Sequence, residues 1–215
     1  MEARNIANGG NAMRHLFAIF AIALYLSLGA NAIAQKLDVL PLPSKADAAK
    51  ATDGTNMGQR YPDFMMMDPG GKDIKLSDLR GKLVVLHFWG AWCPPCVREM
   101  PHLKRLYEQV SSKTDQIVFA FVQINETLER SKAWAKQNGH EIPIFGTYNN
   151  GRSTNVWIDA QRAANVKTYL GVSIFPSTIL LDKHGIVVAW QGGSRHDWAE
   201  LSDQVIALAK EAAAK

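Results

Sequence analysis

Two almost continuous runs of apolar residues constrain the fold of this chain more than any other feature of its sequence. Residues 83–89 read LVVLHFW and residues 117–124 read IVFAFVQI. Strands that are apolar on both faces are typical of a central sheet with helices packed on each side. Between the two runs, residues 94–110 carry apolar side chains at helical spacing. The order of strand, helix and strand therefore predicts an α/β domain.

Weaker patterns continue this layered organisation towards the C-terminus. Further elements are expected, in chain order, as a helix over 126–138, a short strand over 142–145, a helix over 159–170, a hairpin of strands 178–182 and 186–190, and a closing helix over 197–210. The hairpin turns at Lys183-His184-Gly185, so we expect part of the sheet to be antiparallel.

The first 34 residues are predicted to be a secretory signal peptide. Arg14 and His15 precede an apolar run over 16–28, and small residues follow it in the A-x-A patterns of 30–34. Such a run rises about 20 Å as a helix, less than the roughly 30 Å of a hydrocarbon core. We therefore expect export, in a bacterium to the periplasm, and a mature chain beginning near Gln35. The alternative is an uncleaved anchor with the rest of the chain facing the periplasm.

Composition divides the remainder of the chain and excludes some classes of protein. Residues 35–57 are rich in Ala, Lys, Asp, Pro and Gly, which predicts a flexible linker before a compact domain over 58–215. The formal net charge of +4 is spread along the chain and gives little support for nucleic-acid binding. Only two cysteines are present, which excludes a disulfide-stapled mini-protein and a zinc site made of cysteines alone.

Both cysteines lie in the sequence Trp92-Cys93-Pro94-Pro95-Cys96, between the first apolar run and the helical segment. This position puts the Cys93 sulfur at a helix N-terminus, where free N–H groups and the helix dipole favour a thiolate. Cys96 follows one turn later, at a spacing that permits a disulfide, and prolines in a first turn cost a helix little. The pattern indicates thiol–disulfide exchange, while a structural disulfide and half of a metal site remain alternatives.

Residues 89–96, WGAWCPPC, resemble the active site of thioredoxin-fold thiol–disulfide oxidoreductases, and more narrowly of their extracytoplasmic TlpA/ResA/CcmG type. The resemblance covers roughly residues 59–209 and includes YPDF at 61–64, LSDLRGK at 76–82 and FPST at 175–178. It implies an α/β, thioredoxin-like fold in which helices flank a central mixed β-sheet. It also implies an N-terminal β-hairpin extension and an inserted helix or loop segment.

The resemblance assigns roles to several residues. Cys93 would attack a partner disulfide and Cys96 would resolve the mixed disulfide, so the two would form a redox-active pair. Trp92 is expected to contact the substrate. The Phe175–Pro176 peptide bond would be cis and would face Cys93, with the Phe175 backbone pairing with the substrate chain like an added strand. From the residues alone, a trans proline before an edge strand would be expected.

Glu99 lies three residues after Cys96 and on the same face of the predicted helix. Taken alone, it is expected to be a solvated helix residue. In the resembled subgroup, a glutamate at this spacing lies near the cysteine pair and tunes its protonation. We therefore include Glu99 among the candidate catalytic residues.

Two features depart from the family pattern. His87 lies six residues before Cys93, where it could accept a proton or be a hydrogen-bonded core histidine, and the core interpretation is favoured. The stretch 146–165 is longer and more polar than the family segment, which would either shape partner choice or form only a surface loop.

The leading hypothesis is an enzyme that reduces disulfides in exported partner proteins, with c-type cytochrome maturation as one process that it could serve. A membrane electron donor of the DsbD/CcdA type would restore the reduced cysteine pair, and no cofactor is expected. An oxidising or isomerising role remains open.

Two other classes of function compete with this hypothesis. A copper-binding metallochaperone could use Cys93, Cys96, the Met65–Met67 run and His184 or His196 as Cu(I) ligands. The related copper chaperones, however, have three residues between their cysteines. A peroxidase of the peroxiredoxin type would need a Pro-x-x-x-Thr-x-x-Cys pattern, which does not occur around Cys93. Redox exchange is therefore favoured, and no metal site is expected.

Overall fold

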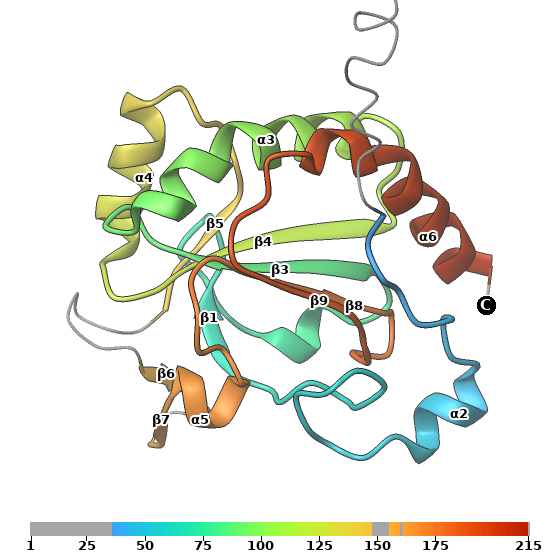
Figure 1. Cartoon of the computed structure of the whole chain (residues 1–215). Helices are drawn as coiled ribbons and strands as arrows, with labels where there is room; N and C mark the ends of the chain where they lie inside the picture. Colours follow the sequence, from blue (N-terminus) through green and yellow to red (C-terminus); the bar gives the residue numbers. More distant parts are fainter. Residues whose placement is uncertain (1–35, 148–154, 160, 215) are drawn as a thin grey trace, which may run out of the picture. The chain divides into compact units, whose positions relative to one another are not determined.

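The computed structural model describes residues 36–147, 155–159 and 161–214 (Figure 1). The predicted signal peptide, residues 1–34, lies outside the described residues, as does part of the polar stretch 146–165. Within the described ranges, no helix has both the length and the apolar character needed to cross a membrane.

A five-stranded sheet forms the centre of the domain. Its strands are β3 (Leu83–Trp89), β4 (Ile117–Gln123), β5 (Ile144–Phe145), β8 (Ser177–Leu181) and β9 (Val187–Gly192). They lie in the order β5-β4-β3-β8-β9; β3 is parallel to β4, β4 is parallel to β5, and β8 is antiparallel to both β3 and β9. The two apolar runs are thus confirmed as the buried strands β3 and β4, and the C-terminal hairpin is confirmed as β8–β9.

Helices α3 (Pro94–Ser111), α4 (Leu128–Gln137) and α6 (Ser202–Ala214) lie on one side of this sheet (Figure 1). A short 3-10 helix, η2 (Trp198–Leu201), leads into α6. Helix α3 buries one apolar stripe, which consists of Met100, Leu103, Leu106 and Val110 together with Cys96 and Glu99. The helices expected before β4, after β4 and at the C-terminus of the chain are therefore present, within a few residues of their predicted bounds.

The opposite face of the central sheet is covered by a second sheet. It consists of β1 (Met65–Met67), β2 (Asp73–Lys75), β6 (Asn155–Trp157) and β7 (Ala163–Asn165), in the order β2-β1-β6-β7. The hairpin β1–β2 is the expected N-terminal extension. Strands β6 and β7 come from the 146–165 stretch, so the described part of that stretch forms more than a surface loop.

The helix expected over 159–170 is only partly correct. The Asp159 carboxylate accepts hydrogen bonds from the main-chain N–H groups of Gln161 and Arg162, each at 2.9 Å, and this tight turn joins β6 to β7. Asn165 then caps helix α5 (Val166–Leu170) by accepting from the N–H of Lys167. Three short-range hydrogen bonds to Asp and Asn side chains therefore accompany the turn and strand that stand where the first half of the helix was predicted.

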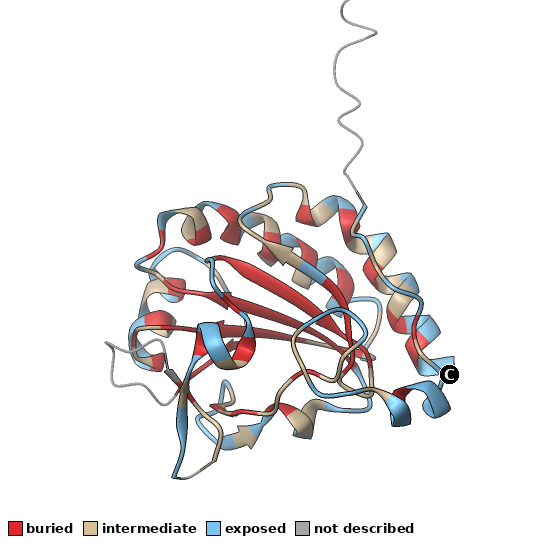
Figure 2. Cartoon of the chain, turned by 60° about the horizontal axis from the view of Figure 1, so that its bottom comes forward, coloured by how far each residue is buried: buried red, intermediate tan, exposed pale blue. Residues whose placement is uncertain are grey.

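Side chains from both sheets share one apolar core. Figure 2 shows that the central strands are buried, whereas the outer helices alternate between buried and exposed residues. The core between the two sheets includes Phe64, Met66, Leu86, Phe88, Ala120, Val122, Ile124, Val156, Val166, Leu170 and Ile179. The short 3-10 helix η1 (Leu76–Leu79) adds Leu76 to this core.

The segment 35–57 differs from its expected role as a flexible linker. In its described part it forms helix α2 (Lys45–Lys50) and buries Leu42. The main-chain N–H of Leu40 donates to the Val188 carbonyl at 2.8 Å, which ties the segment to strand β9. This contact is made by main-chain atoms, so it requires no periodic pattern of apolar side chains. The sequence therefore carried no signal from which it could have been predicted.

Tyr61 offers a test of how strongly the segment before β1 is held to helix α5. Its buried hydroxyl donates to the Leu170 carbonyl at 2.6 Å. Tyr61→Phe leaves this buried acceptor without its donor, so the free energy of unfolding in urea should fall by about 1–2 kcal/mol. Tyr169→Phe is the matched control, because the Tyr169 hydroxyl donates at 2.9 Å to the Asp63 carbonyl in a part-buried position. Equal losses in the two variants would contradict the greater cost expected at the buried site.

Candidate active site

Helix α3 begins at the cysteine pair. Cys93 is the N-cap residue, and Pro94 and Pro95 occupy the first helical positions, where their missing N–H groups have no intrahelical partner in any case. Cys93 and Cys96 form a disulfide with their Cα atoms 5.3 Å apart, and the Cys93 sulfur accepts a hydrogen bond from the Cys96 N–H at 3.3 Å. Cys93 is 3% exposed and Cys96 0%. In the reduced form, the same helix start would stabilise a thiolate on Cys93.

The turn between β3 and α3 is held by the loop that follows β4. One carboxylate oxygen of Glu126 accepts from the Ala91 N–H at 2.8 Å and from the Ser131 hydroxyl at 2.7 Å. The indole N–H of Trp92 donates to the Ile124 carbonyl at 2.7 Å. Glu126 was not predicted as a site residue. One signal could have found it. Glu126 is an acid that follows a buried strand, and parallel strands β3 and β4 end at the same end of the sheet, where the cysteine motif also lies.

Glu99 is buried, in contrast to the solvated position expected from its sequence context alone. One of its carboxylate oxygens accepts a hydrogen bond from the Trp198 indole N–H. Burial raises the pKa of Glu99 from 4.5 to about 8, and the hydrogen bond from Trp198 together with the main chain and charge of Arg195 opposes this rise. Glu99 is therefore mostly protonated near neutral pH, one helical turn from Cys96.

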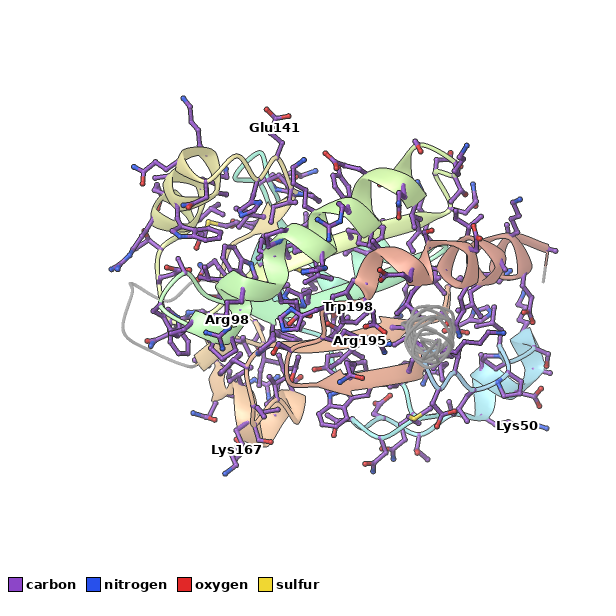
Figure 3. All side chains as sticks on the ribbon, turned by 45° about the horizontal axis from the view of Figure 1, so that its top comes forward. Lys50, Arg98, Glu141, Lys167, Arg195 and Trp198 are labelled. Atoms are coloured by element: carbon purple, nitrogen blue, oxygen red, sulfur yellow. A yellow bond between two sulfur atoms is a disulfide. The ribbon has the colours of Figure 1, made fainter. Side chains whose placement is uncertain are left out.

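Trp198 and Arg195 both interact with Glu99, and Figure 3 labels both side chains. The Arg195 guanidinium lies 5.5 Å from the centroid of the Trp198 ring and is ion-paired with Asp197. Trp198 itself is fully buried. From the sequence, only an apolar role could be expected for Trp198, because nothing in its neighbourhood indicates a polar partner 99 residues away.

His87 is a hydrogen-bonded core histidine, as favoured. Its ring lies edge-on to Phe121, and its Nδ1 is 2.9 Å from the Thr178 hydroxyl oxygen. Burial lowers the pKa of His87 from 6.5 to about 3, so the imidazole is neutral at physiological pH.

The proline loop lies beside the cysteine turn. The Phe175–Pro176 peptide bond is cis, as the resemblance implied, and the Pro176 carbonyl accepts from the Gly193 N–H at 2.9 Å. The rings of Trp92 and Phe175 meet edge to face with centroids 5.7 Å apart. The candidate residues of the two motifs are thus brought together, although they are far apart in the sequence.

Among the residues that the structure describes, no three His, Cys, Asp or Glu side chains are grouped so that they could hold a metal ion. Met66 is fully buried in the core between the two sheets.

Comparison with known proteins places this chain in a family. The family model described as "AhpC/TSA family" matches residues 57–190. The chain belongs to the AhpC/TSA family. It is 36% identical over 132 residues to the thiol-disulfide oxidoreductase ResA of Bacillus thuringiensis, a match that covers 61% of this chain and 67% of that relative. It is 33% identical over 144 residues to ResA of Halalkalibacterium halodurans, covering 66% and 73%.

A solved structure in this fold agrees with the observed architecture. The thioredoxin domain of a thiol-disulfide oxidoreductase from Bacteroides vulgatus matches with a TM-score of 0.55 at 22% identity, over 71% of this chain and 99% of that domain. The family member described here is accordingly a thioredoxin-fold thiol–disulfide oxidoreductase of the ResA type with a C-x-x-C disulfide.

The raised pKa of Glu99 predicts a specific pH dependence of stability. Between about pH 4.5 and pH 8 the unfolded chain loses the Glu99 proton while the folded chain keeps it, so stability should fall as pH rises through this window. Glu99→Gln should remove this fall, whereas Glu108→Gln, which changes an exposed residue of the same helix, should not. Urea unfolding at several pH values measures the difference.

The same substitution should change thiol reactivity. Above about pH 8 the ionised Glu99 carboxylate would oppose thiolate formation at the cysteine pair, so the rate of alkylation by iodoacetamide should show an inflection near that pH. Glu99→Gln should lack this inflection. An unchanged pH–rate profile in Glu99→Gln would exclude a role of Glu99 in thiol protonation.

Proposed function

We propose that this oxidoreductase reduces disulfides in exported partner proteins through Cys93 and Cys96. The observation that carries the proposal is the Cys93–Cys96 disulfide at the first turn of α3, beside the exposed Trp92 and the Phe175–Pro176 loop. An exposed aromatic residue next to such a loop gives a protein substrate a place to dock near the reactive sulfur.

The proposed reaction begins from the dithiol form. The Cys93 thiolate attacks one sulfur of the partner disulfide, a Cys93–partner disulfide forms, and the other partner sulfur leaves as a thiolate. The Cys96 thiolate then attacks the Cys93 sulfur and releases the second partner thiolate. Two electrons pass from the cysteine pair to the partner, and a membrane electron donor of the DsbD/CcdA type would return the pair to the dithiol.

The proposed location is outside the cytoplasm, in the periplasm. Support comes from the basic start, short apolar run and A-x-A pattern of the first 34 residues. A role in c-type cytochrome maturation is supported by the resemblance to the TlpA/ResA/CcmG type.

The reduction potential distinguishes a reductase from an oxidant. Equilibration of the pair in glutathione buffers, followed by alkylation and mass measurement, should give a value near that of thioredoxin, about −270 mV. A value near about −120 mV, typical of a strong oxidant, would contradict a reductase role.

The order of attack is tested by trapping partners. The chain has only two cysteines, so Cys96→Ser removes the second thiol needed to resolve the mixed disulfide and partners should remain bound to Cys93. Cys93→Ser should trap far fewer partners, and Pro176→Thr in the Cys96→Ser background should change their yield or range. Non-reducing electrophoresis of exported extracts with mass spectrometry detects the complexes.

Equal trapping by both cysteine variants would contradict the order of attack. The mass of the chain released from the complexes also tests the location, because loss of residues 1–34 is expected and their retention would indicate an anchor.

A further inference from the structure

Three large apolar side chains near the cysteine turn are unusually exposed. Trp92 is 41% exposed, Ile174 48% and Trp190 46%. In the described part of the chain, only Leu40 and Met57 are comparable large apolar residues, each at 37%. Large exposed apolar patches on a protein surface usually mark an interaction site, so this cluster is a candidate for one.

These three side chains, together with the partly buried Phe175, make up what we call the apolar strip. Trp92 contacts Phe175 edge to face, and Ile174 directly precedes Phe175 in the chain. A Cβ atom built on Gly192 would lie 2.8 Å from the Trp190 ring and 3.2 Å from the Ile174 side chain. Trp190 and Ile174 therefore both lie over Gly192, and the strip runs from the cysteine turn to strand β9.

Strand β9 is also unpaired along this part of its outer edge. The Gly193 N–H bonds to the Pro176 carbonyl, which fixes Gly193 as facing β8. Because hydrogen-bonding direction alternates along an antiparallel strand, the main-chain groups of Trp190 face away from β8. Within the described ranges, no main-chain hydrogen bond satisfies Trp190 on that outer edge.

The strip begins at the place where a substrate must bind. Mixed-disulfide formation ties the partner chain to Cys93, which directly follows Trp92, and the Trp92 ring contacts Phe175. Trp92 is held in place by its hydrogen bond to Ile124, so the start of the strip is preorganised. An extended chain leaving Cys93 along the strip would place its neighbouring side chains on Ile174 and Trp190.

We propose that the apolar strip selects the substrate: it binds an extended segment of a protein partner that has a bulky apolar side chain within a few residues of its disulfide cysteine. Ile174 and Trp190 are the specificity-determining residues. This inference rests on the proposed reductase function and names its substrate class. Glutathione disulfide, which lacks such a side chain, would be reduced without help from the strip.

The test uses the full chain without residues 1–34, reduced with dithiothreitol and freed of reagent. The substrates are two short cysteine peptides, one with Leu and Phe beside the cysteine and one with Ser in their place, each carrying a thionitrobenzoate disulfide. The Cys93 thiolate releases coloured thionitrobenzoate and forms the peptide mixed disulfide, which Cys96 resolves. Glutathione disulfide is the third substrate.

The wild-type protein should react about tenfold faster with the apolar peptide than with the serine peptide, a difference typical of one buried apolar contact. Trp190→Ala and Ile174→Ala, made singly and together, should remove most of this preference. The rate with glutathione disulfide should stay unchanged, which also shows that the variants are folded. Met57→Ala is the matched control, because it shortens an exposed apolar side chain outside the strip.

Each other outcome overturns the inference in a recognisable way. If the variants keep the peptide preference, the strip does not select substrates, while the reductase function stands. If the wild-type protein reduces none of the three substrates, the proposed function itself fails. If sedimentation shows a wild-type dimer that Trp190→Ala dissociates, the strip is covered by a second copy of the chain instead.

Discussion

The site depends on the complete burial of strand β3. Both edges of β3 are paired, to β4 on one side and β8 on the other, and all seven of its residues are buried. A strand fixed in this way cannot slip or bend without breaking the core. The point where β3 ends is therefore fixed, and with it the point where the chain turns and α3 begins. The disulfide is placed by the core of the domain and not by a free loop.

Contacts from distant parts of the chain complete the environment of the disulfide. Glu126 holds the turn, Trp198 closes the buried side over Glu99, and Pro176 lies in the neighbouring loop. Two buried carboxyl groups near one cysteine pair have different environments. Glu126 receives two hydrogen bonds on one oxygen, whereas burial dominates at Glu99 and favours its neutral form. A neutral Glu99 avoids a negative charge beside a thiolate while remaining able to exchange a proton.

The sequence was sufficient for features that depend on local pattern. The apolar run at 83–89 predicted β3 because so short a run of apolar and β-branched residues fits a strand buried on both faces, and the WCPPC motif predicted the start of α3. Features that depend on contacts between distant residues were missed. The burial of Glu99 requires Trp198, and the packing of residues 36–57 uses main-chain groups that every sequence has. The false helix over 159–165 shows a third limit, since one Asp side chain was enough to replace helical geometry with a turn.

The packing of residues 36–57 has a consequence for where this domain can be cut. The matched family region begins at residue 57, so a chain shortened to that boundary would keep both cysteines and every candidate site residue. It would also lose the buried Leu42 and the Leu40 N–H that bonds to the Val188 carbonyl. Val188 and Trp190 would then present unpaired main-chain groups side by side along the outer edge of β9, which is the structural condition for edge-to-edge aggregation. The segment that leads into the domain thus covers this edge with its own main chain, next to the apolar strip that we propose as the partner-binding surface.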